Sequence, residues 1–188
     1  MDYSTDPVRA QGPPAVTEGT PAGPIVLVLD PAGAAKHEAL PATWRDLAGR
    51  WRIIWCRLPA DGGLTEADEL LADPPSPRKV VHVVASGPYA EEALRLAERH
   101  TEPVRSVLLV DPAASRYVGP GHGAEADERW EDDTEKRRWA LTRSGVDVRT
   151  VAHSEGGDLD RIAAPLPLGH PDVVAGVEKA IAELGGAK

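Results

Sequence analysis

Two residues of this chain have side chains suited to nucleophilic or acid–base chemistry and follow predicted strands. Ser86 comes directly after an apolar run, and Gly87 and Pro88 come next. His170 follows another short apolar stretch and precedes a helical pattern. A serine hydroxyl becomes a nucleophile when a neighbouring base takes its proton, and histidine is the commonest such base. Ser86 and His170 are therefore candidates for a reaction centre, although each also fits an ordinary turn that starts a helix.

The elements that must position these residues are short apolar runs that alternate with helical patterns. Strands are predicted at 24–30, 52–57, 79–85, 104–110, 146–153 and 164–168. Helices are predicted at 40–47, 65–73, 89–100 and 171–184. Short unbroken apolar runs are typical of strands buried on both faces, and their alternation with helices predicts βαβ units. We therefore expect an α/β fold, a three-layer sandwich whose mostly parallel sheet has about six strands and carries helices on both faces.

Two segments differ from this alternation. Residues 1–23 are rich in Pro, Gly, Thr and Ala and lack periodicity, so they are predicted to be a flexible leader. Residues 24–188 are predicted to form one domain. Within it, residues 112–145 begin with glycines and continue as a highly charged helix carrying Trp130 and Trp139. We interpret this segment as an irregular insertion, with the charged residues facing solvent.

Composition and charge narrow the possible partners and location. The chain has 188 residues, 41% of them hydrophobic, and a formal net charge of −9. This charge argues against nucleic acid or an anionic membrane as a partner, because both attract basic surfaces. Cys56 is the single cysteine, which excludes an internal disulfide and favours the reducing cytoplasm. The bias towards Ala, Arg, Gly, Pro and Val is typical of a bacterium with a GC-rich genome.

Neither a cofactor nor a metal is predicted. His122, His153 and His170 are scattered along the chain without the paired spacing of metal ligands. Neither a Gly-x-Gly-x-x-Gly motif nor a phosphate-loop lysine follows the first strand, which argues against a bound nucleotide. Cys56 lies inside a predicted strand and is interpreted as a buried apolar residue. The expected partner is a small-molecule ligand or substrate, or a protein.

The stretch VHVVASGPYAEEALRLAERHTEPVRSVLLVDPA, residues 81–113, resembles the central block of the α/β-hydrolase superfamily. In that family an apolar strand leads into a Gly-x-Ser-x-Gly nucleophile elbow, followed by a helix and a strand that ends near Asp-Pro. Residues 24–50 are similar to its first strand, oxyanion loop and following helix, and residues 52–63 to its second strand and turn. The resemblance implies an α/β-hydrolase-like fold, with residues 112–145 as a reduced cap over the site.

The nucleophile elbow departs from the family pattern at two positions. A gap-free match places Gly87 at the serine position and Pro88 at the position whose N–H would donate to an oxyanion. Proline has no N–H, so this match lacks both the nucleophile and one oxyanion donor. A shift of one residue instead makes Ser86 the nucleophile and Gly87 the donor, with Val84 crowding the elbow.

The resemblance also implies partners for a nucleophile. LGHPDV, residues 168–173, is similar to the loop of the catalytic histidine, so His170 matches that histidine. Asp160 or Asp158 matches the acid that orients it, and Asp111 is a substitute acid. A helix-start turn remains the other interpretation of His170.

The loop after the first strand completes the implied crevice. Asp30 stands where the family usually has the histidine of a His-Gly pair, and it would place a negative charge beside a developing oxyanion. Ala32 and Gly33 have backbone N–H groups that could point into the crevice, or the loop only caps the next helix. The residues expected to bind a ligand are Asp30, Ala32, Gly33, Gly87 and Tyr89.

These observations lead to one expected function and two alternatives. We expect an α/β-hydrolase-fold protein that lacks the standard serine nucleophile and binds a small apolar ligand or a protein partner at the former active-site crevice. The first alternative is an active ester or thioester hydrolase that uses Ser86, His170 and Asp160. The second is catalysis without a serine, with His170 as general base.

Overall fold

The computed structural model describes residues 13–31, 39–58, 63–75, 80–114, 123–154 and 164–186. Within them, six strands form one sheet in the order β1-β3-β2-β4-β5-β6. The strands are β1 (Ala15–Gly19), β2 (Ile25–Asp30), β3 (Arg52–Arg57), β4 (Val81–Ser86), β5 (Val104–Val110) and β6 (Asp147–Ala152). β1 pairs with β3 in the antiparallel sense, and the other neighbours are parallel. The predicted mostly parallel sheet is confirmed.

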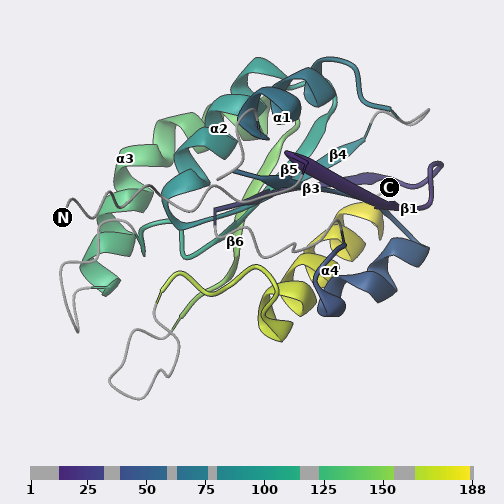
Figure 1. The fold of residues 1–188 in the computed structure, drawn as a ribbon. Coiled ribbons are helices and arrows are strands. Elements are labelled where there is room, and N and C mark those ends of the chain that lie inside the picture. The colour runs from purple at the N-terminus through teal and green to yellow at the C-terminus, as the bar shows by residue number, and fades with distance from the viewer. Residues whose placement is uncertain are drawn as a thin grey trace, which may run out of the picture.

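Helices cover both faces of this sheet (Figure 1). One face carries α1 (Gly63–Ala72), α2 (Ala90–Arg99) and α3 (Gly123–Arg143), and the other carries the 3-10 helix η1 (Ala42–Gly49) and α4 (Pro171–Gly186). Side chains alternate along the buried strands, so Leu27 and Leu29 pack towards the first layer and Val26 and Val28 towards the second. The predicted three-layer sandwich is confirmed. None of the described helices combines the length and hydropathy that a membrane span requires.

β1 lies in the segment predicted to be a leader. The prediction is wrong for residues 15–19, which form the antiparallel edge of the sheet with Val16 buried and facing Trp55 of β3. The sequence AVTEG contains no apolar run, because an edge strand of this kind need cover only one face. Residues 1–12 lie outside the described residues.

α3 connects β5 to β6 and belongs to the helical layer. Its side chains Trp130 and Leu141 are buried in the core cluster on that face of the sheet. The highly charged helix predicted within residues 112–145 is confirmed as α3, and residues 115–122 lie outside the described residues. The interpretation of this segment as a reduced cap stays a prediction. Periodic burial of a few apolar side chains is enough to dock a helix whose other positions are charged.

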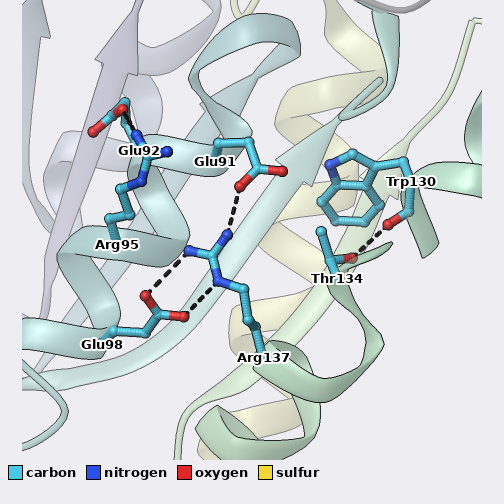
Figure 2. Close-up of polar contacts among 7 residues, drawn as sticks. All are labelled: Glu91, Glu92, Arg95, Glu98, Trp130, Thr134 and Arg137. Carbon is cyan, nitrogen blue, oxygen red and sulfur yellow. Dashed lines mark hydrogen bonds and ion pairs between the residues drawn. The ribbon is translucent and has the colours of Figure 1, made fainter. Parts of the chain in front are cut away.

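An arginine joins α3 to α2 on the outer side of this layer. Figure 2 shows the Arg137 guanidinium between Glu91 and Glu98. Its Nη1 donates to Glu91 Oε2 at 2.5 Å, and its Nε donates to Glu98 Oε1 at 2.7 Å. These bonds raise the pKa of Arg137, those to Glu98 most. In the same view the Thr134 hydroxyl donates to the Trp130 carbonyl one turn earlier. The charges of α3 are therefore partly used in packing between helices.

Residues 164–168 do not form the predicted strand. Their backbone bends instead, and Pro165 and Pro167 have no N–H to donate to a neighbouring strand. This part of the chain, called the 164–168 segment below, reaches Gly87 at the end of β4 and Asp111 at the end of β5. It therefore covers the carboxyl ends of two strands.

Candidate functional site

The strand order creates a binding position at the carboxyl ends of β2 and β4. From β2 the chain crosses to β3 on one side and then returns to β4 on the other side. Ligands of open α/β sheets bind outside the carboxyl ends of the strands at such a reversal. Asp30 is the last residue of β2, and Ser86 is the last residue of β4. The fold therefore brings these two predicted site residues together.

A pocket of about 310 Å³ lies at this position and is called the carboxyl-edge pocket below. Asp30 and Ser86 supply polar side chains to its lining, and Pro31, Pro88 and residues 165–168 supply the apolar remainder. Ligand pockets typically combine apolar walls with a few polar groups that fix orientation. The lining therefore favours a small, mostly apolar molecule.

Asp30 is the acidic side chain of this lining, and it is buried. Its Oδ2 accepts a hydrogen bond from the Trp55 indole, with Nε1 at 2.7 Å. Trp55 lies on β3 and packs edge to face against Trp44, with ring centroids 5.3 Å apart. A buried carboxyl group needs such donors because burial removes its contacts with water. A carboxyl group offers several acceptor positions, so Asp30 suits a ligand that donates a hydrogen bond.

The turn from β4 into α2 is left-handed at Gly87, where φ is +48°. A Cβ atom added at Gly87 would lie 2.9 Å from Cγ of Pro165. A real Cβ does not tolerate this distance, and a proline ring has little freedom to move away. Ser86, in contrast, has an extended backbone with φ −126° and ψ 153°, and it is buried. The left-handed residue of the strand-to-helix turn is therefore Gly87, and Pro165 occupies the space that a side chain there would need.

Asp111, at the end of β5, is fully buried among hydrogen-bond donors. Its Oδ1 accepts from the backbone N–H and hydroxyl of Ser154, at 2.7 and 3.0 Å, and its Oδ2 accepts from the Leu166 N–H at 2.7 Å. Nδ1 of His153 lies 3.5 Å from Asp111 Oδ1. Burial tends to raise the pKa of Asp111, but the bonds from His153, Leu166 and Ser154 lower it overall. The bond to Asp111 is also the main reason why the pKa of His153 is raised.

His170 makes its described contacts within its own turn. Its Nδ1 accepts the backbone N–H of Asp172, at 3.2 Å, where α4 begins. Neither His170 nor Tyr89 is among the described residues that line the carboxyl-edge pocket. Asp111 contacts His153 rather than His170. Four further predicted site residues, Ala32, Gly33, Asp158 and Asp160, lie outside the described residues.

Two features of this edge were not predicted, namely the pairing of Asp111 with His153 and the contact of Pro165 with Gly87. The first left a signal in the sequence, because Asp111 and His153 each stand at the end of a predicted strand. Parallel strands that neighbour each other bring such residues together at one edge. The sequence gives no such indication of the contact between Pro165 and Gly87, because the apolar stretch 164–168 predicts a strand rather than a bend.

The described residues offer little else for chemistry at this edge. No group of three or more His, Cys, Asp or Glu side chains within them is arranged to hold a metal ion. Cys56 is buried in β3, and burial, with a smaller effect of Glu66, raises the pKa of its thiol to about 12. A thiol that stays protonated is a poor nucleophile.

No protein-family model and no curated protein matches the chain. Among solved structures, it is similar to a "Thioesterase Domain From Curacin Biosynthetic Pathway", with 14% sequence identity and a TM-score of 0.37. The match covers 69% of this chain and 62% of that domain, so the chain spans less than two thirds of its length. A likeness at this level says nothing about activity.

Proposed function

We propose that this chain is an α/β-hydrolase-fold protein without the standard serine nucleophile, and that its carboxyl-edge pocket binds a small apolar ligand. The observation that carries this proposal is the contact between Gly87 and Pro165. The left-handed residue after β4 stands where the family elbow has its serine, and Pro165 leaves no room there for a side chain. The same 164–168 segment then supplies apolar walls to the pocket.

The polar residues of the pocket favour a ligand that donates a hydrogen bond. The Asp30 carboxyl group accepts hydrogen bonds when ionised, and the Ser86 hydroxyl both donates and accepts. An alcohol or amine on an apolar skeleton would donate to Asp30 while its body contacts Leu166 and Leu168. A carboxylate on the same skeleton has no hydrogen to donate to the Asp30 carboxyl group, so it lacks the contact that the alcohol and the amine make.

The competing function is ester or thioester hydrolysis with Ser86 as nucleophile. The observation that favours it is the presence of the Ser86 side chain in the pocket lining. Against it, Ser86 has an ordinary extended backbone inside β4, and the described contacts of His170 and Asp111 do not lead to it. Catalysis with His170 as general base stays a prediction.

The first experiment treats the purified protein and Ser86→Ala with a fluorophosphonate probe, which labels activated serines. A commercial serine esterase confirms that the probe is active, and circular dichroism confirms that both proteins are folded. We expect no labelling of either protein above a denatured control. Labelling of the wild type that disappears in Ser86→Ala would overturn the proposal and establish the hydrolase alternative.

The second experiment measures binding of three probes with one skeleton by the shift in melting temperature. These are cyclohexylmethanol, cyclohexylmethylamine and cyclohexanecarboxylate. We expect the alcohol and amine to stabilise the protein, by about 2.7 kcal/mol at a hundred times Kd, and the part of the shift that is lost in Asp30→Asn to be smallest for the carboxylate. Asp30→Asn should weaken the amine most, whereas Asp172→Asn, an exposed control, should not. Equal shifts with all three probes, unchanged in Asp30→Asn, would contradict this ligand class.

A further inference from the structure

A second pocket, of about 280 Å³, lies at the opposite edge of the sheet and is called the amino-edge pocket below. Its lining includes Pro24 before β2, Val80 before β4, His82 and Arg105 near the starts of β4 and β5, and Ile181 and Leu184 from the last turns of α4. His82 and Ser86 are four residues apart on β4, which corresponds to about 13 Å along an extended strand. The two pockets are therefore separate sites.

His82 is a buried polar residue that the fold alone does not fully use. It is 4% exposed, and its Nδ1 lies 2.8 Å from the hydroxyl oxygen of Ser106, which is buried on β5. The described structure gives its other nitrogen, Nε2, no hydrogen-bond partner, and Nε2 is not among the fully enclosed unpaired atoms. His82 lines the pocket, and Nε2 is the ring nitrogen that its contact with Ser106 leaves for a ligand.

The hydroxyl of Ser106 decides what Nε2 offers. Burial, with a smaller effect of Arg105, lowers the pKa of His82 to about 4, so the ring is neutral near pH 7. A neutral imidazole has one donor and one acceptor nitrogen. When the Ser106 hydroxyl donates to Nδ1, the proton of the ring is on Nε2. His82 then offers an N–H donor to the pocket.

Arg105 adds a positive charge to the same lining. Its Nη1 donates to the Gly145 carbonyl at 3.3 Å, and a guanidinium has five N–H donors, so this bond leaves donors for a ligand. A guanidinium is well matched in geometry to a carboxylate. The end of α4 carries partial negative charge, which opposes an anion, so binding of an anion depends on Arg105.

We propose that the amino-edge pocket binds the anion of a short-chain carboxylic acid. The carboxylate accepts hydrogen bonds from the Arg105 guanidinium and from Nε2–H of His82, and the alkyl chain packs against Ile181 and Leu184. One buried and one half-buried apolar side chain, with two donor residues in the same lining, are the combination expected of a site for a small amphipathic anion. This site is independent of the function proposed for the carboxyl-edge pocket.

The test follows the imidazole resonances of the full chain by NMR while hexanoate, hexanol or hexylamine is added. Loss of one resonance in His82→Gln identifies the signal of His82. We expect hexanoate to shift this signal in a saturable way, hexanol to bind at least about tenfold more weakly, and hexylamine not to bind. A His82 signal that hexanoate leaves unchanged, or that hexylamine shifts at lower concentration, would overturn the proposal.

Two arginine variants make the test specific. Arg105→Gln should weaken hexanoate binding at least about tenfold, because it removes the charge that pairs with the carboxylate. Arg129→Gln makes the same chemical change at an exposed position of α3 and should leave the affinity unchanged. Arg105 is itself exposed, so its variant is expected to fold, and the remaining imidazole resonances verify this. Equal affinity in the Arg105 and Arg129 variants would refute the proposed site.

Discussion

The ends of β4 and β5 both turn through left-handed backbone, yet the two turns are stabilised in different ways. Gly87 has φ +48° and Asp111 has φ +42°. At Gly87 the conformation costs little because there is no side chain, and the space beside it is filled by Pro165. At Asp111 the conformation is unfavourable by about 1–2 kcal/mol, and the hydrogen bonds from Ser154 and Leu166 offset this cost.

Both turns contact the 164–168 segment, but they do so through different groups. Gly87 lets the 164–168 segment approach closely, and Asp111 binds the backbone of that segment at Leu166. Further along, the Trp44 indole donates to the Leu168 carbonyl at 2.8 Å. The left-handed turn after β4 is thus a packing site for the 164–168 segment. The 164–168 segment is therefore held in place at the carboxyl edge of the sheet.

The largest expected effect is the loss of the Asp111 carboxylate. Asp111→Ala leaves the buried N–H groups of Leu166 and Ser154 without an acceptor and keeps the backbone strain, so we expect the free energy of unfolding to fall by about 3–5 kcal/mol. Urea denaturation followed by circular dichroism measures this change. Asp172→Ala, at an exposed carboxylate, should cost less than about 0.5 kcal/mol. A similarly small loss for Asp111→Ala would show that the hydrogen bonds of Asp111 do not hold the 164–168 segment in place.

The next effect tests the packing at Gly87. Gly87→Ser adds strain in the left-handed region and a clash with Pro165, and together these should cost about 2–4 kcal/mol. Gly145→Ser is a matched control, because Gly145 has φ +89° but no atom within 4 Å of an added Cβ. It should cost only the strain, about 1–2 kcal/mol.

A second substitution separates the clash from the strain. Pro165→Ala removes Cγ, the atom nearest to an added Cβ at Gly87, so Gly87→Ser in that background should lose at least about 1 kcal/mol less than in the wild type. The double-mutant cycle is measured by the same urea titrations. Additive losses in this cycle would mean that Pro165 does not exclude a side chain at Gly87, and the main support of the proposed function would be removed.

Much of the fold could be predicted from the sequence because buried parallel strands are nearly continuous apolar runs. Residues 25–30, 52–57 and 81–86 are such runs, and all three are strands of the sheet. β1 was missed because Val16 is its one strongly apolar side chain among Thr, Glu and Gly. The stretch 164–168 was wrongly predicted as a strand because its leucines and prolines are apolar, although proline cannot continue a hydrogen-bonded ladder.

The site could be predicted only in part, because residues at strand ends are visible in a sequence but the neighbours of a strand are not. Asp30 and Ser86 were predicted as site residues, and both line one pocket. The two residues lie close together because they end two neighbouring parallel strands, β2 and β4. The partner of Asp111 depends on which strand lies beside β5, and the contact of Pro165 depends on a bend 78 residues after Gly87. Neither pattern is local enough to be read from composition or periodicity.

The smallest expected effect concerns the contribution of His153 to the free energy of unfolding, which depends on pH. Because the pKa of His153 is raised in the folded protein, mainly by Asp111 and also by Asp127, its contribution is fully present below the unfolded pKa of about 6.5. The contribution is lost as the pH rises through the folded pKa. His153→Gln should therefore reduce the free energy of unfolding at pH 5.5, by less than about 1 kcal/mol since the imidazole is partly exposed, and have little effect at pH 9.

Urea titrations of the wild type and His153→Gln at several pH values measure this difference. The same pair in an Asp111→Asn background should show a smaller difference at pH 5.5, because Asp111 is the main cause of the raised pKa. Within the described residues, the atoms that an added Cβ at Gly87 would meet belong to Pro165, which has no ionisable group. The Gly87→Ser and Pro165→Ala cycle should therefore give the same coupling at both pH values. A pH-dependent coupling at Gly87, or a His153 effect that grows towards pH 9, would mean that the two strand ends are not stabilised in the different ways inferred here.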